Sequence, residues 1–239
     1  MFDCEGHRIR HELKYHLNFM QYRILRRKLQ AVLKSDSHAG PDGRYHIRSL
    51  YFDDISNSAF FDKMAGVPTR KKYRMRIYNY SDDFIKFERK RKFNEYVCKD
   101  VAVISREEAD RIIKGDVSSL ANSDKQLLRC FYLECRRNLM RPVALVDYLR
   151  EAYIHPIGNV RITFDIGLRT SLGAVHFFDK ATSTVTAYEE PGVILEVKFD
   201  AVLPEVVRGL LTGVIRPRSA LGKFAMCRGS KGVLGPCFC

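Results

Sequence analysis

The sequence predicts an α+β fold in which an antiparallel β-sheet curls into a tunnel and helices pack around its outside. At least five strand-like runs alternate Arg, Lys and Glu with Ile, Val, Leu and Phe. A strand places successive side chains on opposite faces, so each run has one ionic and one apolar face. Helix signals between the runs provide elements that can cover the apolar face. The ionic face is then left to line the concave inside of the sheet.

The stretch from Lys71 to Lys99 shows this alternation most densely. Two strand-like runs flank a polar turn at residues 79–83. Arg74 and Arg76 share one face of the first run with Tyr78. One face of the second run carries Lys86, Glu88, Lys90 and Lys92. Alone, the pattern also fits an ordinary antiparallel sheet with one solvated face. The charges on the other strands must therefore decide between a solvated face and a functional one.

The rest of the chain alternates further strand and helix signals. Strands are expected at residues 8–17, 45–53, 101–104, 142–153, 158–166 and 193–199. Asn18 is expected to cap a helix ending near Lys34, and a short helical turn is expected at residues 56–64. Capping boxes at Ser105 and Ser123 predict helices at residues 106–114 and 124–137. Pro204 and Gly213 bracket another helix, and a last short one is expected at residues 218–226.

Composition and charge describe a globular protein with an anionic partner. Of the 239 residues, 46% are hydrophobic and 29% are charged, and the net charge is +13. Such an excess suits nucleic acid, an acidic membrane surface or a phosphorylated substrate. We expect one domain over residues 1–228, with a helical lobe at about residues 105–140, and a flexible C-terminal tail at residues 229–239.

Localisation signals and cysteines point to the cytoplasm. No apolar run approaches the ~20 residues that span a bilayer, and the first ten residues do not have the pattern of a signal peptide. Membrane association would therefore need a partner or the basic surface. The seven cysteines include no CxxC pair, which favours free thiols in a reducing compartment over a zinc site.

An interior lined by Arg and Lys requires an anion. Like charges 4 Å apart cost about 4 kcal/mol at an effective dielectric constant of 20. A phosphate chain would relieve this repulsion, because Arg and Lys bind its oxygens well. The carboxylates of the same faces are Glu12, Glu88, Asp165 and Glu196. Either they pair with neighbouring cations, or one or two of them hold Mg²⁺ or Mn²⁺ that bridges phosphates.

An ordered set of short motifs carries a family resemblance. The motifs are RHELKY (residues 10–15), SLYFD (49–53), YRMRIY (73–78), FERK (87–90), Lys99, DYLREAY (147–153), VRITFD (160–165), LEVKF (195–199) and Lys223-Phe224. In this order the chain resembles the catalytic domain of the VTC (vacuolar transporter chaperone) polyphosphate polymerases, within the CYTH or triphosphate-tunnel superfamily. Each motif is weak alone, whereas the ordered set covers nearly the whole chain.

The resemblance implies an antiparallel triphosphate tunnel that transfers the γ-phosphoryl group of ATP to a growing polyphosphate chain. The catalytic residues it implies are Lys14, Arg74, Arg76, Lys90, Lys99, Arg150, Arg161 and Lys223. Secondary phosphate contacts are expected from Arg10, Lys92 and Lys198. Mn²⁺ or Mg²⁺ is expected at Glu196, with Glu88 and Glu12 as further candidate ligands. The positions agree with the strand alternation.

One departure from the superfamily pattern bears on the reaction. Many of its hydrolases and cyclases carry Glu-x-Glu-x-Lys on an early strand, where this chain has Arg10-x-Glu12-x-Lys14. Exchanging a carboxylate for Arg weakens metal binding there and adds a phosphate contact. This favours a polymerase over a triphosphatase or an adenylate cyclase.

Two other functions remain open at this point. One is a hydrolase of tripolyphosphate or short polyphosphate that uses the same tunnel. The other is a non-catalytic module that binds polyphosphate or nucleic acid, which the basic charge and interleaved tyrosines permit. Mixing Glu with the cations argues against a specific nucleic acid. The expected partners are ATP and inorganic polyphosphate, and a separate membrane protein is left open.

Overall fold

The structure, a computed structural model, describes residues 10–94, 96–171, 176–187, 192–213 and 222–229. Its strands are β1 (His11–Asn18), β2 (Lys34–Ser35), β3 (Arg44–Asp53), β4 (Thr69–Tyr78), β5 (Ser81–Phe93), β6 (Tyr96–Ile104), β7 (Arg141–His155), β8 (Val160–Ser171), β9 (Thr184–Thr186) and β10 (Gly192–Phe199). Its α-helices are α1 (Phe19–Val32), α2 (Ser58–Met64), α3 (Arg106–Ile113), α4 (Gln126–Asn138), α5 (Glu205–Leu211) and α6 (Lys223–Gly229). Two 3₁₀ turns, η1 (Ser118–Asn122) and η2 (Ile157–Asn159), complete the described elements.

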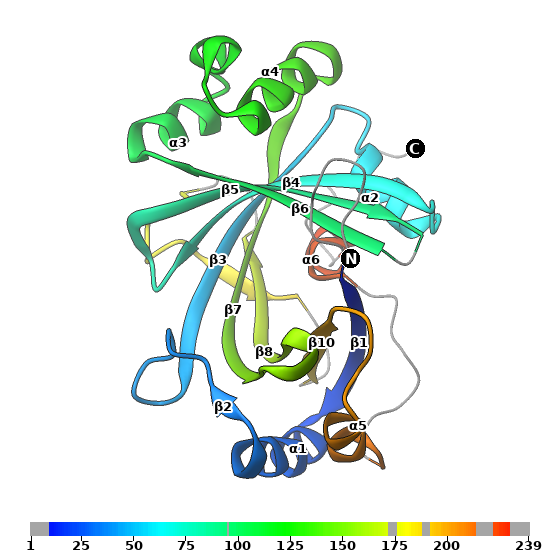
Figure 1. Cartoon of the computed structure of the whole chain (residues 1–239). Coiled ribbons are helices and arrows are strands. Elements are labelled where there is room, and N and C mark those ends of the chain that lie inside the picture. Colours follow the sequence, from blue (N-terminus) through cyan, green and yellow to red (C-terminus); the bar gives the residue numbers. More distant parts are fainter. Residues whose placement is uncertain (1–9, 95, 172–175, 188–191, 214–221, 230–239) are drawn as a thin grey trace.

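The strands form one antiparallel sheet that curls on itself (Figure 1). Its order is β1-β10-β8-β7-β3-β4-β5-β6, with β2 beside β7 and β9 beside β8. The two ends of this path, β1 and β6, meet at an isolated bridge between Arg10 and Val97. Among the described residues the ladder is otherwise open there, so the sheet surrounds a tunnel without closing fully. The predicted α+β tunnel is confirmed.

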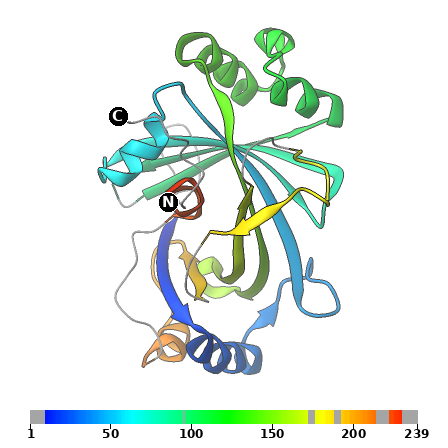
Figure 2. The ribbon, with the colours of Figure 1, turned by 180° about the vertical axis from the view of Figure 1, so that it is seen from behind.

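Helices cover the outside of the sheet at two opposite places (Figures 1 and 2). The outward side chains of β1, β8 and β10 pack with α1 and α5 into one core that includes Leu17, Leu25 and Leu195. Those of β4, β5 and β6 pack with α3, η1 and α4 around Phe87 and Phe131. Burying one such side chain contributes roughly 2 kcal/mol, so these cores hold the sheet in its curved form.

The helix α6 differs from the others because it lies against the inner side of the sheet. Phe224 stacks on Tyr51 of β3, with 5.1 Å between the ring centroids, and contacts Phe60 of α2 edge-on. The third apolar cluster therefore fills part of the inside of the sheet. As a result, Lys223 is brought inside the tunnel.

Two helix starts follow the sequence signals directly. Asn18 accepts a hydrogen bond from the Gln21 backbone N–H and forms a capping box at α1. Ser105 and Glu108 make the same arrangement at α3. The capping box predicted at Ser123 is wrong, because its hydroxyl accepts from the Lys125 N–H and α4 begins later, at Gln126.

Several strand boundaries also differ from the prediction. The Lys71–Lys99 stretch holds parts of three strands, since β6 already starts at Tyr96 and includes the run expected separately at residues 101–104. The turn between β4 and β5 is only Asn79-Tyr80, both with positive φ. β8 begins at Val160 and runs on to Ser171, and the short strands β2 and β9 were not predicted.

Some expectations fall at the edges of the described chain. The start of the first strand at residues 8–9, the beginning of the last helix at residues 218–221, and residues 230–239 of the expected tail lie outside the described residues. The segment expected as a helical lobe contains α3, η1 and α4. The assignment of residues 1–228 to one domain stays a prediction.

Candidate phosphate tunnel

The inner face of four neighbouring strands and α6 carries a network of ion pairs centred on Glu196. Antiparallel register sets Lys14 of β1 opposite Glu196 of β10, and Arg150 of β7 opposite Asp165 of β8. Glu196 lies 2.6 Å from Lys223 Nζ and 3.0 Å from Lys198 Nζ. Its contacts to Lys14 and Arg150 are longer, at 3.7 and 3.8 Å. One carboxylate therefore holds four cations.

Asp165 anchors the same network at its deepest point. Its side chain is fully buried, and it accepts hydrogen bonds from Arg150 Nε at 2.6 Å and Nη2 at 2.8 Å. Lys223 Nζ lies 2.5 Å away, so α6 is tied to both carboxylates. Burial opposes the charge of Lys223, but Asp165 and Glu196 outweigh it and raise the pKa of this lysine. Lys223 is thus a buried cation that stays charged.

A second group of ion pairs lies on β4, β5 and β6. Glu88 is buried and accepts from Arg74 Nε at 2.6 Å and from Lys99 Nζ at 2.9 Å. Burial alone would raise the pKa of Glu88, but Arg74, Arg76 and Lys99 hold it well below its usual range. Arg76 is buried as well, and it donates to the Ser49 hydroxyl and to Tyr148 Oη.

Tyr148 and Lys90 connect the two groups. Arg150 also donates to Tyr148 Oη, at 3.4 Å, so this hydroxyl lies between Arg76 and Arg150. Lys90 of β5 reaches Glu12 of β1 at 2.5 Å, and Lys14 lies 3.3 Å from the same carboxylate. Together these contacts form the interior ion network, which comprises Lys14, Glu12, Arg74, Arg76, Glu88, Lys90, Lys99, Arg150, Asp165, Glu196, Lys198 and Lys223.

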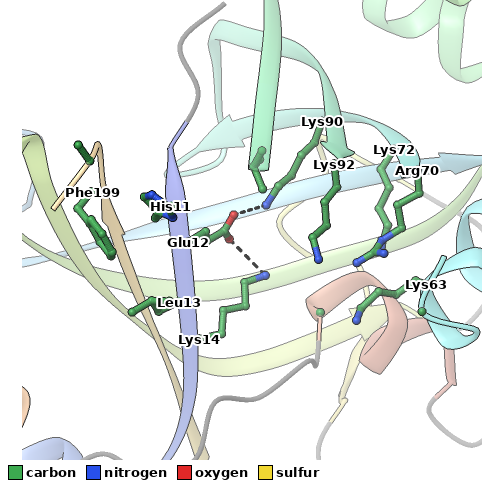
Figure 3. Close-up of a pocket in the computed structure, with 14 residues that line it drawn as sticks. His11, Glu12, Leu13, Lys14, Lys63, Arg70, Lys72, Lys90, Lys92 and Phe199 are labelled. Atoms are coloured by element: carbon green, nitrogen blue, oxygen red, sulfur yellow. Dashed lines mark hydrogen bonds and ion pairs between the residues drawn. The ribbon is translucent and has the colours of Figure 1, made fainter. Parts of the chain in front are cut away.

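A cavity of about 670 Å³ opens beside this network, between β1, β4, β5 and α2 (Figure 3). Six cationic side chains line it: Lys14, Lys63, Arg70, Lys72, Lys90 and Lys92. Glu12 is the one carboxylate among its lining residues. We call this space the mouth cavity. It adjoins the interior ion network at Glu12, Lys14 and Lys90.

The excess of positive charge perturbs the lysines of the mouth cavity. Burial first, and then Lys14, Lys90 and other nearby cations, lower the pKa of Lys72 to about 7. Burial also lowers the pKa of Lys90 to about 8, although Glu12 opposes the shift. Lys72 Nζ lies over the Phe224 ring, 4.7 Å from its centroid. No described carboxylate pairs with it.

The predicted site residues thus fall into a central set and a peripheral set. The structure brings together Lys14, Arg74, Arg76, Lys90, Lys99, Arg150, Lys198 and Lys223 with the candidate metal ligands Glu12, Glu88 and Glu196, and Lys92 lines the mouth cavity beside them. Arg161 donates to Asp36 and, at 2.9 Å, to Tyr45 Oη. Arg10 donates to Asp200 at 3.2 Å and to the Asn159 carbonyl at 2.8 Å. Neither of these two arginines lines the mouth cavity.

Three cationic lining residues of the mouth cavity were not predicted. Lys72 and Arg70 lie on the same face of β4 as Arg74 and Arg76, so extending that alternation toward the N-terminus would have found both. Lys63 had no such signal. It lies on the short helix α2, and only the packing of α2 against β3 and β4 brings it to the cavity.

The carboxylates offer a limited site for a divalent ion. Among the described residues, no three His, Cys, Asp or Glu side chains cluster closely enough to hold a metal. Glu12 and Glu196 nevertheless share one positive charge, because Lys14 Nζ lies within 3.3 and 3.7 Å of them. Magnesium at phosphate sites is commonly held by one or two carboxylates together with phosphate oxygens. The pair therefore fits such an ion when phosphate is present, whereas Glu88 lies with Arg74 and Lys99.

Other observations concern thiols and the membrane. The thiols of Cys130 and Cys135 are free, and Cys98 and Cys227 are buried. In the part of the chain that is described, the helices are too short or too polar to span a bilayer.

Comparisons with known proteins agree with this architecture. The sequence profile of the VTC domain matches residues 9–229.

Two similar solved structures are a putative adenylyl cyclase from Hippeastrum, described as having a dominant triphosphatase activity, and a putative adenylate cyclase from Bacillus halodurans. The first is 16% identical with a TM-score of 0.53, covering 92% of this chain and 94% of its own. The second is 12% identical with a TM-score of 0.51, covering 87% and 89%. No curated protein matches the sequence. The two structures share the fold.

Proposed function

The chain belongs to the VTC domain family, and from this premise we propose that it is a polyphosphate polymerase. It transfers the γ-phosphoryl group of ATP to the end of an inorganic polyphosphate chain. The observation that carries the proposal is the convergence of Lys14, Arg76, Arg150 and Lys223 on the inner face of one curled sheet. These residues come from β1, β4, β7 and α6, and the carboxylates beside them, Asp165 and Glu196, are already paired with cations.

The reaction needs no protein nucleophile. A terminal oxygen of the acceptor chain forms a bond to the γ-phosphorus, the bond from that phosphorus to the β,γ-bridging oxygen breaks, and ADP leaves. Charge in such a loose transition state spreads over the equatorial phosphoryl oxygens. Fixed guanidinium and ammonium groups stabilise that charge without reorganising. Arg76 is suited to this role because its direct hydrogen bonds go to hydroxyl groups, which leaves its charge for a phosphate.

A divalent ion would be held by Glu196 and Glu12 together with phosphate oxygens, and would supply charge neutralisation at the transferred group. Burial tends to raise the pKa of Glu196, but Lys198, Lys223 and other cations keep it well below its usual range. The carboxylate is therefore ionised at neutral pH, and a metal ion would share it with the four cations that it contacts.

Incubating the full chain with ATP and Mn²⁺ tests the proposal. We expect ADP and polyphosphate, resolved by chain length on a gel. Release of orthophosphate alone would identify a hydrolase in which water is the acceptor. Salt-dependent RNA binding without ATP turnover would identify a binding module.

The variant Glu196→Gln sharpens this experiment. It should lower polyphosphate formation by about tenfold or more, since it removes a charged ligand of the metal at the transferred phosphoryl group. Lys28→Gln is the matched control, because Lys28 is exposed on α1 outside the tunnel. Equal activity in Glu196→Gln and the native protein would contradict the assigned role of Glu196.

A further inference from the structure

The helix α1 covers the sheet with one side and exposes apolar side chains on another. The residues that it buries in the core with β1, β8 and β10 are Tyr22, Leu25 and Leu29. On its outer side, Phe19 is 57% exposed, Met20 62% and Ile24 45%. A helix on the surface of a globular protein usually carries polar residues toward the solvent. The first two turns of α1 therefore carry apolar side chains that the packing of the helix does not use.

Arginines lie among these exposed apolar side chains. Arg23 and Arg27 are one helical turn apart, both are exposed, and they share a side of α1 with Met20. Among the residues that the structure describes, neither arginine has an ion-pair partner, whereas Arg26 nearer the core pairs with Glu151 at 2.7 Å. Acidic residues in the first turn would stabilise the helix, but α1 contains no Asp or Glu. The outer side of α1 is thus both apolar and cationic.

The helix α5 lies beside α1 at the same end of the molecule, opposite α3 and α4 (Figures 1 and 2). Val206 of α5 and Val202, just before this helix, are exposed as well. The cation of α5 is already paired, because Arg208 lies 3.4 Å from Glu205. This end of the molecule therefore presents exposed apolar side chains on two neighbouring helices, and unpaired arginines on α1. We call the five exposed residues Phe19, Met20, Arg23, Ile24 and Arg27 the α1 face.

The α1 face fits the surface of an anionic bilayer better than it fits other occupants. Helices that lie in a bilayer surface place apolar side chains at the boundary between headgroups and acyl chains, while neighbouring cations contact lipid phosphates. A second copy of this chain, docked symmetrically on the same face, would bring like charges together at Arg23 and Arg27. A nucleic-acid backbone would pair with the arginines but offers little apolar surface to Met20 and Ile24.

We propose that the α1 face docks this chain on the surface of a bilayer that contains anionic lipids. The apolar side chains of the face enter the headgroup boundary, and its two arginines contact lipid phosphates. The helix lies on the bilayer without crossing it, because Leu25 and Leu29 on its other side stay in the core of the protein. The α1 face is outside the tunnel, so this docking does not depend on which reaction the tunnel performs.

Co-sedimentation of the full chain with lipid vesicles tests the proposal. The native protein should bind vesicles of phosphatidylcholine mixed with phosphatidylserine, and bind vesicles of phosphatidylcholine alone much more weakly. Each cation at an anionic surface contributes ~1 kcal/mol, which is a factor of about five in affinity. Arg23→Gln with Arg27→Gln should therefore weaken binding about tenfold or more. Met20→Ser with Ile24→Ser should weaken it by a similar factor, because less apolar surface leaves water.

A tryptophan placed in the α1 face gives a local readout. The sequence contains no Trp, so Ile24→Trp adds a single indole fluorophore. Its emission should shift to shorter wavelength when phosphatidylserine vesicles are added, because the indole ring leaves water. Leu133→Trp is the matched control, since Leu133 is 48% exposed on α4 at the opposite end of the molecule. Its emission should not shift.

The charge control is Arg136→Gln with Arg137→Gln, which removes two exposed arginines of α4 and should leave vesicle binding unchanged. An equal loss in this control would mean that net charge alone attracts the protein, and would overturn the proposal. Melting curves check that each variant folds.

Three other results would also overturn it. The native protein could fail to bind phosphatidylserine vesicles. The serine variant could bind as tightly as the native protein, which would mean that the apolar side chains stay in water. Finally, sedimentation could show a dimer that dissociates in Met20→Ser with Ile24→Ser, which would make the α1 face an interface between copies. An ATP incubation that yields no polyphosphate would contradict the polymerase and leave the docking unaffected.

Discussion

The mouth cavity and the interior ion network adjoin at Lys14, yet they balance charge in opposite ways. In the network, buried cations such as Lys223 and Arg150 are matched by Asp165 and Glu196 at 2.5–2.8 Å. In the cavity, Lys72 lies over an aromatic ring, and burial together with nearby cations lowers its pKa. The network therefore contributes to the fold without a ligand, whereas a charged Lys72 costs the folded protein free energy.

The largest expected effect comes from breaking the network. Lys223→Met leaves Asp165 and Glu196 short of a cation in a buried environment. Removing one partner of a buried ion pair typically costs 3–5 kcal/mol. We expect a loss of about that size in the free energy of unfolding, measured by urea denaturation. A change below about 1 kcal/mol, the range of exposed ion pairs, would show that the network is solvated and does not stabilise the fold.

Filling the tunnel is expected to have the next largest effect. Tripolyphosphate at about 100 times its Kd should raise the free energy of unfolding by about 2.7 kcal/mol, because it binds only the folded protein. The measurement compares the melting temperature in tripolyphosphate with the melting temperature in chloride of equal ionic strength. In the double variant Arg74→Ala with Arg76→Ala, the two melting temperatures should be the same. If it keeps the difference, tripolyphosphate binds outside the interior network.

Removing a mouth charge should stabilise the empty protein. The pKa of Lys72 is lower in the folded than in the unfolded state, so the folded state is penalised at pH values below about 7 and the penalty disappears as pH rises toward the unfolded value. Lys72→Met should therefore raise the free energy of unfolding by about 2 kcal/mol at pH 7. Denaturation at pH 7 and pH 10 measures this, and the gain should shrink at pH 10. Destabilisation at both pH values would place Lys72 with the network residues.

The smallest expected effect comes from Arg10, next to the start of β1. Arg10 is partly exposed and paired with Asp200, and exposed pairs contribute about 0–1 kcal/mol. Arg10→Gln should thus change the free energy of unfolding by less than about 1 kcal/mol in urea. A tenfold loss of polyphosphate affinity in this variant would instead make Arg10 a main phosphate contact.

Strand alternation predicted much of the interior ion network. It could not show which of the buried arginines face the tunnel. Arg76 and Arg48 both lie in strands with mixed faces, and both are buried. Arg76 faces the tunnel, whereas Arg48 pairs with Asp147 at 2.8 Å on the other side of the sheet, close to Phe177. Which face is inside depends on where the covering helices pack, and local sequence does not specify that.

The sequence by itself determined the period-two ionic faces, the capped helices α1 and α3, and the excess of positive charge, because these depend on side-chain type and short-range spacing. Only the tertiary structure decided which charges are compensated. Lys223 meets Asp165 and Glu196 because α6 packs inside the sheet, and Lys63 reaches the mouth cavity because α2 lies beside β4. Compensation depends on contacts between segments far apart in the chain, and those exist only once the sheet has curled.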